Sequence, residues 1–158
     1  MELIWKWHTF SELTTEELYT ILKLRQEIFV VEQQCIYLDC DNFDKSSYHL
    51  AGWKKDRETC ELLAYLRVMY PQKTNQLPRI GRLLVHSKMR QRGLGNLLIH
   101  KALQHIHLHQ PGVKVQISAQ AYLINFYKAL GFQVTSDIYE EDNIPHVDMI
   151  YSPCSNGF

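Results

Sequence analysis

Residues 90–95, Arg-Gln-Arg-Gly-Leu-Gly, form the segment whose residue types and spacing best fit a chemical task. The segment lies between an apolar run at 80–85 and a helical stretch at 96–109, so Gly93 and Gly95 stand at a strand-to-helix junction. Glycines let the backbone turn tightly there, and several N–H groups then point together at the positive end of the helix. With two arginines beside it, the segment predicts a site for a phosphate or pyrophosphate group.

The same segment differs from two common nucleotide-binding loops. It lacks the Gly-Lys-Ser/Thr ending of a P-loop, so it offers no lysine for a terminal phosphate and no hydroxyl for magnesium. The third glycine of a dinucleotide fingerprint would fall at Leu98, and no early βαβ unit surrounds the motif. An ordinary loop with a glycine at a helix start is the structural alternative, and a nucleotide-binding protein is the functional rival.

Further segments place this loop in a family. The pattern Arg-x-x-Gly-x-Gly after an apolar strand resembles the acyl-CoA pyrophosphate loop of the GNAT superfamily of N-acetyltransferases, and residues 125–132 resemble that superfamily's later helix, a tyrosine followed by Gly-Phe. Residues 25–33 and 139–146 are similar to the ElaA-like branch. So are four positions that follow the first of these segments, Tyr37, Asp41, Asp44 and His49. The resemblance covers residues 3–151.

The resemblance implies that acetyl-CoA binds as co-substrate. Its pyrophosphate is expected on the glycine loop, and its pantetheine arm is expected to pair with the exposed backbone of a splayed strand, as in strand addition. Gln120 stands where many members carry an asparagine seven residues before the tyrosine; the amide is kept but its reach differs. The implied coenzyme contacts are Leu83, Leu84, Val85, Arg90, Gln91, Arg92, Gly93, Leu94, Gly95, Asn96 and Gln120.

Tyr127 is the residue that the family motif assigns to protonating the leaving thiolate of CoA. A phenol with an ordinary pKa near 10 stays protonated at neutral pH, and a thiolate leaving group needs a proton or a strong hydrogen bond. The alternative is a tyrosine that only packs its helix onto the sheet. The strand at 83–85 has a similar alternative, as a plain core strand.

The acceptor side should carry carboxylates, because an amine arrives mostly as an ammonium ion and must lose a proton before it attacks. The resemblance places the end of the first helix and the late loop around the acceptor, and Glu32 is the predicted base. Each of these acidic residues could equally be a solvated loop residue, and His146 could serve as a base or close a turn after Pro145. The other predicted acceptor-side residues are Gln33, Tyr37, Asp41, His49, Glu140, Glu141 and His146.

Composition limits the remaining function classes. The 17 basic and 17 acidic residues give no global field for nucleic acid. The first nine residues do not resemble a signal peptide and no apolar run has the length of a membrane span, so we expect a cytoplasmic protein without a membrane partner. The four cysteines form no CxxC pair and are expected as free thiols. His105 and His109 share a helix face without a carboxylate at ligand spacing, so no metal is expected.

Apolar periodicity and turn residues predict one domain over residues 1–151, followed by a loose tail at 152–158. The fold class is α/β, as an α+β mixed sheet, and the order is β, α, βββ, α, β, α, ββ. The resemblance implies a GNAT-like fold whose mostly antiparallel sheet is splayed at the middle and flanked by helices. Strands are predicted at 3–9, 48–53, 60–70, 79–85, 113–119, 132–137 and 147–151, and helices at 14–31, 96–109 and 121–130.

Together these features predict an acetyl-CoA-dependent N-acetyltransferase in which a primary amine attacks the thioester directly within a ternary complex. Cys35 has no activating partner at a readable spacing, so no covalent acyl-enzyme is expected. The alternative is a non-catalytic acyl-CoA-binding sensor with the same fold. The acceptor is a small molecule or a peptide, and the sequence leaves a peptide N-terminus, a lysine, a polyamine and a small amine open, together with the oligomeric state.

Overall fold

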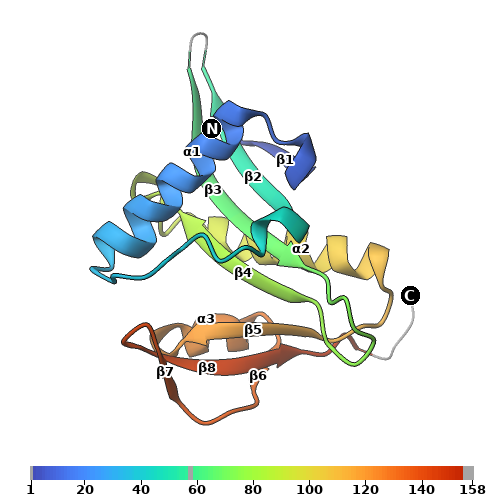
Figure 1. Cartoon of the computed structure of the whole chain (residues 1–158). Helices are drawn as coiled ribbons and strands as arrows, with labels where there is room; N and C mark the ends of the chain where they lie inside the picture. Colours follow the sequence, from blue (N-terminus) through green and yellow to red (C-terminus); the bar gives the residue numbers. More distant parts are fainter. Residues whose placement is uncertain (1, 57–58, 155–158) are drawn as a thin grey trace.

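The computed structural model describes residues 2–56 and 59–154 (Figure 1). Within these residues eight strands form one sheet, and its neighbouring pairs are antiparallel except for β4 and β5. The order along the sheet is β1 (Ile4–Thr9), β2 (Ser47–Lys55), β3 (Cys60–Met69), β4 (Arg79–Val85), β5 (Val115–Gln120), β8 (Ile144–Tyr151) and β6 (Phe132–Val134), and β7 (Tyr139–Glu141) pairs with β8. The predicted mixed, mostly antiparallel sheet is confirmed.

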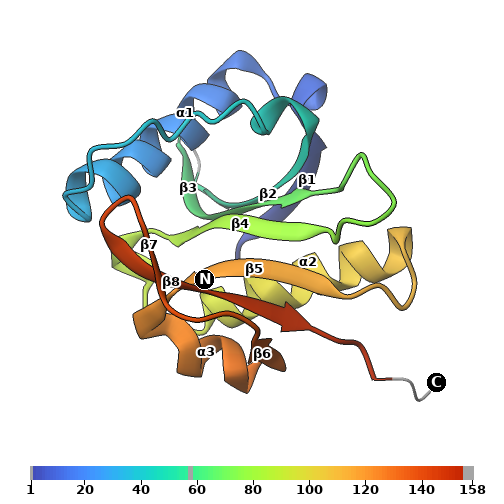
Figure 2. The same cartoon turned by 60° about the horizontal axis from the view of Figure 1, so that its bottom comes forward.

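In the described part of the chain, three α-helices cover the two faces of this sheet: α1 (Thr15–Arg25), α2 (Leu94–His109) and α3 (Ile124–Ala129). Figure 2 shows α1 and the loop that follows it on one side of the sheet, and α2 and α3 on the other. The buried residues of α2, such as Leu98 and Ile106, pack with one core cluster, whereas Ile21 and Leu24 of α1 pack with a second. Residues 62–68 of β3 are buried without a break, so both faces of the sheet are covered there.

The first helix begins where the sequence predicts. Thr14 accepts a hydrogen bond from the backbone N–H of Glu17, whose carboxylate bonds back to the Thr14 N–H in a capping box. The helix does not run evenly to residue 31, because residues Gln26–Glu32 form a π-helix. Such wider turns are common at functional sites, and this one leads into the long loop at 33–46.

The parallel pair β4 and β5 opens along its length. The register joins the two strands at Arg79 and Gln116 alone, and the backbone N–H of Gln116 also donates to Pro78. On its other edge β4 pairs with β3 through a register shift, and Arg82 in β4 takes a positive φ of 54°. A bulge of this kind bends a strand and increases its twist, so β4 turns away from β5 beyond Arg79. The expected splay is therefore present.

The late segment at 139–146 differs from the loop that periodicity suggested. Tyr139–Glu141 forms β7, and β8 begins at Ile144, three residues before the predicted strand. Asp142 and Asn143 join them with positive φ angles of 49° and 61°, which suits a two-residue hairpin turn. Residues 57–58 of the predicted β2–β3 turn and 155–158 of the predicted tail lie outside the described residues.

Candidate active site in the split between β4 and β5

A cavity of about 1500 Å³ lies where β4 and β5 part. Its walls come from both strands, the loop at 33–46, the start of α2, α3 and the β7–β8 hairpin. No helix within residues 2–56 and 59–154 combines the length and the hydropathy of a membrane span. The predicted site residues that line the cavity are Glu32, Gln33, Tyr37, Asp41, Leu83, Leu84, Val85, Arg90, Gln91, Gly93, Leu94, Gly95, Asn96, Gln120, Tyr127, Glu141 and His146.

Gly93 and Gly95 serve different purposes at the start of α2. Gly93 is the N-cap with a φ of +76°, and nothing lies within 4 Å of the position a Cβ would take there. Gly95 has ordinary backbone angles, but a Cβ there would lie 3.2 Å from Cζ of Phe126 in α3. The first glycine therefore sets the backbone turn that leaves the first helix N–H groups free for a ligand, and the second lets α3 approach closely.

Arg90 connects the glycine loop to the end of the first helical segment. Its Nε donates to the carbonyl of Val85 at 3.2 Å, and a terminal nitrogen lies 2.6 Å from Oε1 of Glu32. Both side chains are close to half exposed, so water screens this ion pair. The arginine places positive charge against the predicted base, while Arg92 is exposed and does not line the cavity.

Tyr127 is buried in α3, with 7 % of its surface exposed, and still lines the cavity. Its ring packs edge-on against Phe126 and Phe132, with centroid distances of 4.9 and 5.7 Å. Burial raises the pKa of Tyr127 to about 12. The phenol is therefore protonated throughout the neutral range, and the packing role that sequence reasoning left open exists beside any chemical one.

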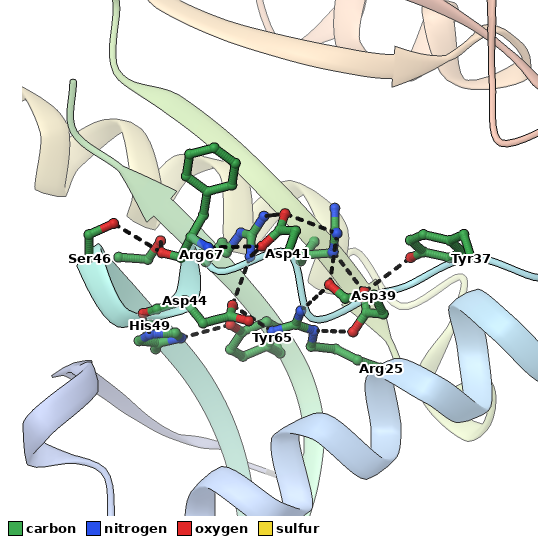
Figure 3. Close-up of polar contacts among 12 residues, drawn as sticks. Arg25, Tyr37, Asp39, Asp41, Asp44, Ser46, His49, Tyr65 and Arg67 are labelled. Atoms are coloured by element: carbon green, nitrogen blue, oxygen red, sulfur yellow. Dashed lines mark hydrogen bonds and ion pairs between the residues drawn. The ribbon is translucent and has the colours of Figure 1, made fainter. Parts of the chain in front are cut away.

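Three arginines and three aspartates form a closed ring on the α1 side of the cavity (Figure 3). Each arginine contacts two aspartates and each aspartate contacts two arginines, so the charges alternate around the ring. The links are Arg25 to Asp39 and Asp44, Arg67 to Asp44 and Asp41, and Arg82 to Asp39 and Asp41. The ring ties the loop at 33–46 to α1, β3 and β4, and thus fixes one wall of the cavity.

The ring changes the interpretation of Asp41, which was expected to meet an amine. Burial would raise the pKa of Asp41, but hydrogen bonding and charge from Arg67, with Arg82 beside it, hold it at about 2. The carboxylate accepts bonds from both arginines, and its charge is already balanced. Asp41 lines the cavity as part of a charge-neutral wall rather than as an isolated anion.

Two residues that were predicted on the acceptor side, His49 and Glu140, do not line the cavity. His49 is 1 % exposed, and its two ring nitrogens lie 2.8 Å from the Tyr65 hydroxyl and 2.9 Å from the Asp44 carbonyl. Burial lowers the pKa of His49, so its imidazole is neutral. Through the Asp44 carbonyl it contacts the ring of arginines and aspartates on the side away from the cavity. Glu140 is exposed on β7 and points away from the cavity lining, because residues alternate between the two faces of a strand.

Two polar contacts join the loop at 33–46 to the other side of the cavity. Nε2 of Gln120 donates to Oε1 of Gln33 at 3.2 Å, and the Cys35 thiol donates to the carbonyl of Asp142 at 2.9 Å. Sequence reasoning treated Cys35 as a free thiol without an activating partner and did not predict this contact. The thiol is buried and bonds across the mouth of the cavity to the β7–β8 turn.

Sequence reasoning also missed Ser118 on β5, whose hydroxyl lies 3.0 Å from Oε2 of Glu141 within the cavity. The three ring arginines were missed as well, although each interrupts an apolar pattern. Arg67 and Arg82 stand inside strands of apolar residues, and Arg25 shares the apolar stripe of α1. A charged residue in such a position signals a buried partner.

The predicted histidine group on α2 forms an aromatic cluster. His105 stacks on Trp7 at 4.0 Å and on His109 at 4.2 Å, and its Nδ1 lies 3.0 Å from the Tyr70 hydroxyl. Within residues 2–56 and 59–154 no three His, Cys, Asp or Glu side chains are grouped so that they could hold a metal ion.

Comparison with known proteins supplies the family context for this site. Residues 42–153 match the family model described as an acetyltransferase (GNAT) domain. The UPF0039 protein sll0451 of Synechocystis is 39 % identical over 157 residues, covering 99 % of this chain and 100 % of that protein. Protein ElaA of Escherichia coli is 40 % identical over 141 residues, covering 88 % of this chain and 90 % of ElaA.

Solved structures agree with these sequence matches. An acyl-CoA N-acyltransferase from Pseudomonas aeruginosa superposes with a TM-score of 0.88 at 38 % identity, covering 96 % of this chain and 100 % of that chain. The crystal structure of E. coli ElaA gives 0.87 at 38 % identity, covering 95 % and 99 %. An aminoglycoside 6'-N-acetyltransferase complexed with coenzyme A gives 0.68 at 14 % identity, covering 96 % and 99 %, and therefore shares the fold alone.

Proposed function

The chain belongs to the ElaA-like branch of the acetyltransferase (GNAT) family, and we propose that it transfers an acetyl group from acetyl-CoA to a primary amine by direct attack in a ternary complex. The observation that carries the proposal is the parting of β4 from β5 beyond Arg79, directly beside the free N–H groups at the start of α2. A strand edge and an anion site so arranged match the two polar parts of a CoA molecule, its pantetheine amides and its pyrophosphate.

In this proposal the pyrophosphate lies on residues 90–96 and the pantetheine arm adds to β4 along Leu83, Leu84 and Val85. Leu84 and Val85 pair with β3 along one edge of β4, and Leu83 lies at the register shift between the two strands. All three residues line the cavity. The open edge also offers a backbone N–H near the thioester oxygen. One such donor, aimed at the oxyanion that forms when the amine attacks, is worth about 3 kcal/mol in comparable sites.

The acetyl group then passes directly to the amine. The C–N bond forms as the nitrogen attacks the thioester carbon, the C–S bond breaks, and Tyr127 donates its proton to the departing sulfur. The acetylated nitrogen then loses its extra proton to water, and the Tyr127 phenolate takes up a proton from water. Cys35 takes no covalent part, because its thiol is buried and already donates to the carbonyl of Asp142. The acceptor enters between the loop at 33–46 and the β7–β8 hairpin, where a small amine or the amine of a peptide fits.

Two measurements test the proposal. Calorimetry with acetyl-CoA, CoA and ATP should show tight binding of both CoA ligands and none of ATP; tight ATP binding without CoA binding would favour the nucleotide-binding rival. The free thiol released from acetyl-CoA should rise above background hydrolysis with at least one member of a panel of primary amines. If CoA binds and every amine in a broad panel leaves the thiol at background, the non-catalytic sensor takes the place of the enzyme.

A further inference from the structure

Four oxygen-bearing side chains form a continuous chain that leads out of the cavity. Oε2 of Glu141 lies 3.0 Å from Oγ of Ser118, which lies 2.6 Å from the hydroxyl of Tyr139, and that hydroxyl lies 2.8 Å from Oδ1 of Asp148. Glu141 and Ser118 line the cavity, whereas Tyr139 and Asp148 stand behind them. The chain therefore connects the acceptor side of the cavity to a carboxylate outside it.

The register of the sheet brings these four side chains together. Ser118 of β5 and Asp148 of β8 are direct cross-strand partners, so their side chains lie on the same face. Tyr139 and Glu141 are two residues apart on β7 and share a face for the same reason. Asp148 is also held independently, because its N–H donates to Oγ of Ser136 at 2.8 Å.

The number of hydrogens in this hydrogen-bonded chain shows whether it is complete without an added proton. Three oxygen–oxygen contacts need three hydrogens, and the hydroxyls of Ser118 and Tyr139 supply one each. An ionised carboxylate supplies none. All three contacts are satisfied together only when Glu141 or Asp148 carries one additional proton. The arrangement is thus completed by taking up a proton, which is the product that an ammonium acceptor must release.

We propose that Glu141 takes the proton of the acceptor ammonium and that Ser118 and Tyr139 relay it to Asp148; this inference rests on the proposed amine acetylation. The ammonium N–H bond breaks and an O–H bond forms on Glu141. Glu141 then gives a proton to Ser118, Ser118 gives its own to Tyr139, and Tyr139 gives its own to Asp148, which releases it to water. Each hydroxyl ends with one proton, and the amine keeps the electron pair it needs for attack.

The charged neighbours favour Glu141 over the other carboxylates of the cavity. Glu32 is paired with Arg90, and Asp41 is paired with Arg67 and Arg82, so both carboxylates already have arginine partners. Among the described residues the ion-pair partner of Glu141 is His146, whose Nε2 lies 3.9 Å away.

Few other titratable side chains lie near these four hydrogen-bonded residues. The His146 ring stacks on Tyr139 at 6.2 Å, while Glu140 on the same strand is exposed on the opposite face. Burial, together with the negative charge of Asp148 and Glu141, raises the pKa of Tyr139, so its hydroxyl is protonated between transfers.

The first experiment needs no acceptor. Side-chain carboxyl carbons of Glu141 and Asp148 are followed by carbon-detected NMR as the pH is lowered, in the wild type and in Tyr139→Phe, which keeps the ring stacked on His146. In the wild type both signals should move together over one pH range, because they share one proton. In Tyr139→Phe each should titrate separately. Identical curves for the two proteins would overturn the proposal, and this result does not depend on whether the protein acetylates any amine.

The second experiment uses the amine that gives the fastest thiol release among n-butylamine, putrescine and a short peptide with a free N-terminus. Tyr139→Phe and Ser118→Ala should lower kcat by about 10-fold or more, within the range of general acid–base contributions, with little change in KM for acetyl-CoA. The acid limb of the kcat profile should move to lower pH, and Ser118→Thr should restore most of the rate.

The matched control is Ser136→Ala. It removes a hydroxyl that accepts a hydrogen bond from the backbone N–H of Asp148 but is not one of the four groups of the proposed relay. This variant should keep the wild-type rate and pH profile. Equal losses in Ser136→Ala and Tyr139→Phe would assign the effect to the stability of the hairpin and refute the relay. If no amine is turned over by the wild type, the NMR titration alone decides.

Discussion

At the scale of single residues, Tyr127 combines two requirements that often compete. Its ring is held by Phe126 and Phe132, while the side chain still lines the cavity. A phenol whose pKa is raised to about 12 by burial is a reliable proton carrier at neutral pH but a weaker acid. It can still protonate a thiolate, because the sulfur becomes strongly basic as its bond to carbon breaks.

Tyr127→Phe should therefore separate catalysis from packing. The variant keeps the buried ring and loses only the hydroxyl, so kcat should fall by about 10- to 100-fold. The affinity for CoA should change less than about two-fold, and both are measured by thiol release and calorimetry. Tyr122→Phe, at an exposed tyrosine that also lines the cavity, is the control and should keep the wild-type rate. Equal rates for Tyr127→Phe and wild type would leave Tyr127 a packing residue.

At Gly93, two substitutions of nearly the same shape separate the effect of charge from the effect of size on CoA binding. Aspartate and asparagine have nearly the same shape, and both tolerate a positive φ better than most residues. Because no atom lies within 4 Å of a Cβ at this position, both variants should fold. Gly93→Asp should weaken CoA binding by about 10-fold more than Gly93→Asn, since only the first puts negative charge beside the pyrophosphate. Calorimetry measures the difference, and equal affinities for the two variants would argue against a pyrophosphate on this loop.

The residues that sequence could identify are those whose task is local. The glycine loop is readable because six consecutive residues set both its backbone and its charge. Asp41 lines the cavity, and its partners Arg67 and Arg82 lie 26 and 41 positions away in the chain. Spacing along the sequence carries no signal for such pairs, and the arginine partners of Asp41 were not predicted for that reason.

At the scale of elements, the ring of three arginines and three aspartates replaces regular secondary structure in the loop at 33–46. Arg25 is fully buried at the end of α1 and bonds both Asp39 and Asp44 at 2.7 Å. Burial alone would lower the pKa of Arg25, but the Asp44 hydrogen bond and the surrounding negative charge raise it on balance. The arginine remains charged, and removing it would leave the buried Asp39 and Asp44 with one arginine partner each, Arg82 and Arg67, instead of two.

Arg25→Met should destabilise the protein by about 3–5 kcal/mol, which is the usual cost of removing one member of a buried ion pair. The free energy of unfolding from urea titration measures it. Lys23→Met, two residues earlier on the exposed side of α1, is the control and should change stability by about 0.5 kcal/mol or less. A loss below about 1 kcal/mol in Arg25→Met would show that the loop does not depend on the ring.

The elements themselves were largely predictable, and the exceptions have physical reasons. The central strand Arg79–Val85 agrees with the predicted bounds, because apolar residues and flanking turn residues define it. β7 was missed because three residues are too few for a periodic pattern, and its turn uses Asp142 and Asn143 rather than a glycine. The π-helix at Gln26–Glu32 has the same composition as an ordinary helix end, so sequence gave no sign of it.

At the scale of the whole molecule, both the sheet and the cavity depend on one opening. β4 and β5 join the two halves of the sheet through a single register pair, and helices on both faces supply the packing that strand pairing does not. The opening cannot be read from either strand alone, since each has an ordinary strand pattern. Only the family resemblance indicated it before the structure was known.

Acid should destabilise this molecule in two separate ranges of pH. His105 is packed between Trp7, Tyr48 and His109, and burial together with the neighbouring His109 lowers its pKa to about 4. In the unfolded chain an ordinary histidine has a pKa of about 6.5, so the unfolded state binds more protons between these values. Stability is complete above about pH 6.5 and falls as the pH decreases towards 4. A second loss follows below about pH 4, where Asp41, held at a pKa of about 2, would protonate more readily when unfolded.

The first range can be tested with His105→Phe, which keeps a flat ring in the stack and cannot be protonated. Because His105 is only partly buried, its share of the stability lost between pH 7 and pH 5 is about 1 kcal/mol, or about 3 °C in Tm for a domain of this size. The fall in Tm over this range should therefore be smaller in His105→Phe by that amount, even though loss of the Tyr70 hydrogen bond lowers its Tm at pH 7. His107→Phe, at an exposed position of the same helix, should retain the full wild-type dependence. If the Tm of His105→Phe and that of His107→Phe fall by the same amount between pH 7 and pH 5, the acid sensitivity arises elsewhere. His49 is then the next residue to replace, because burial lowers its pKa too.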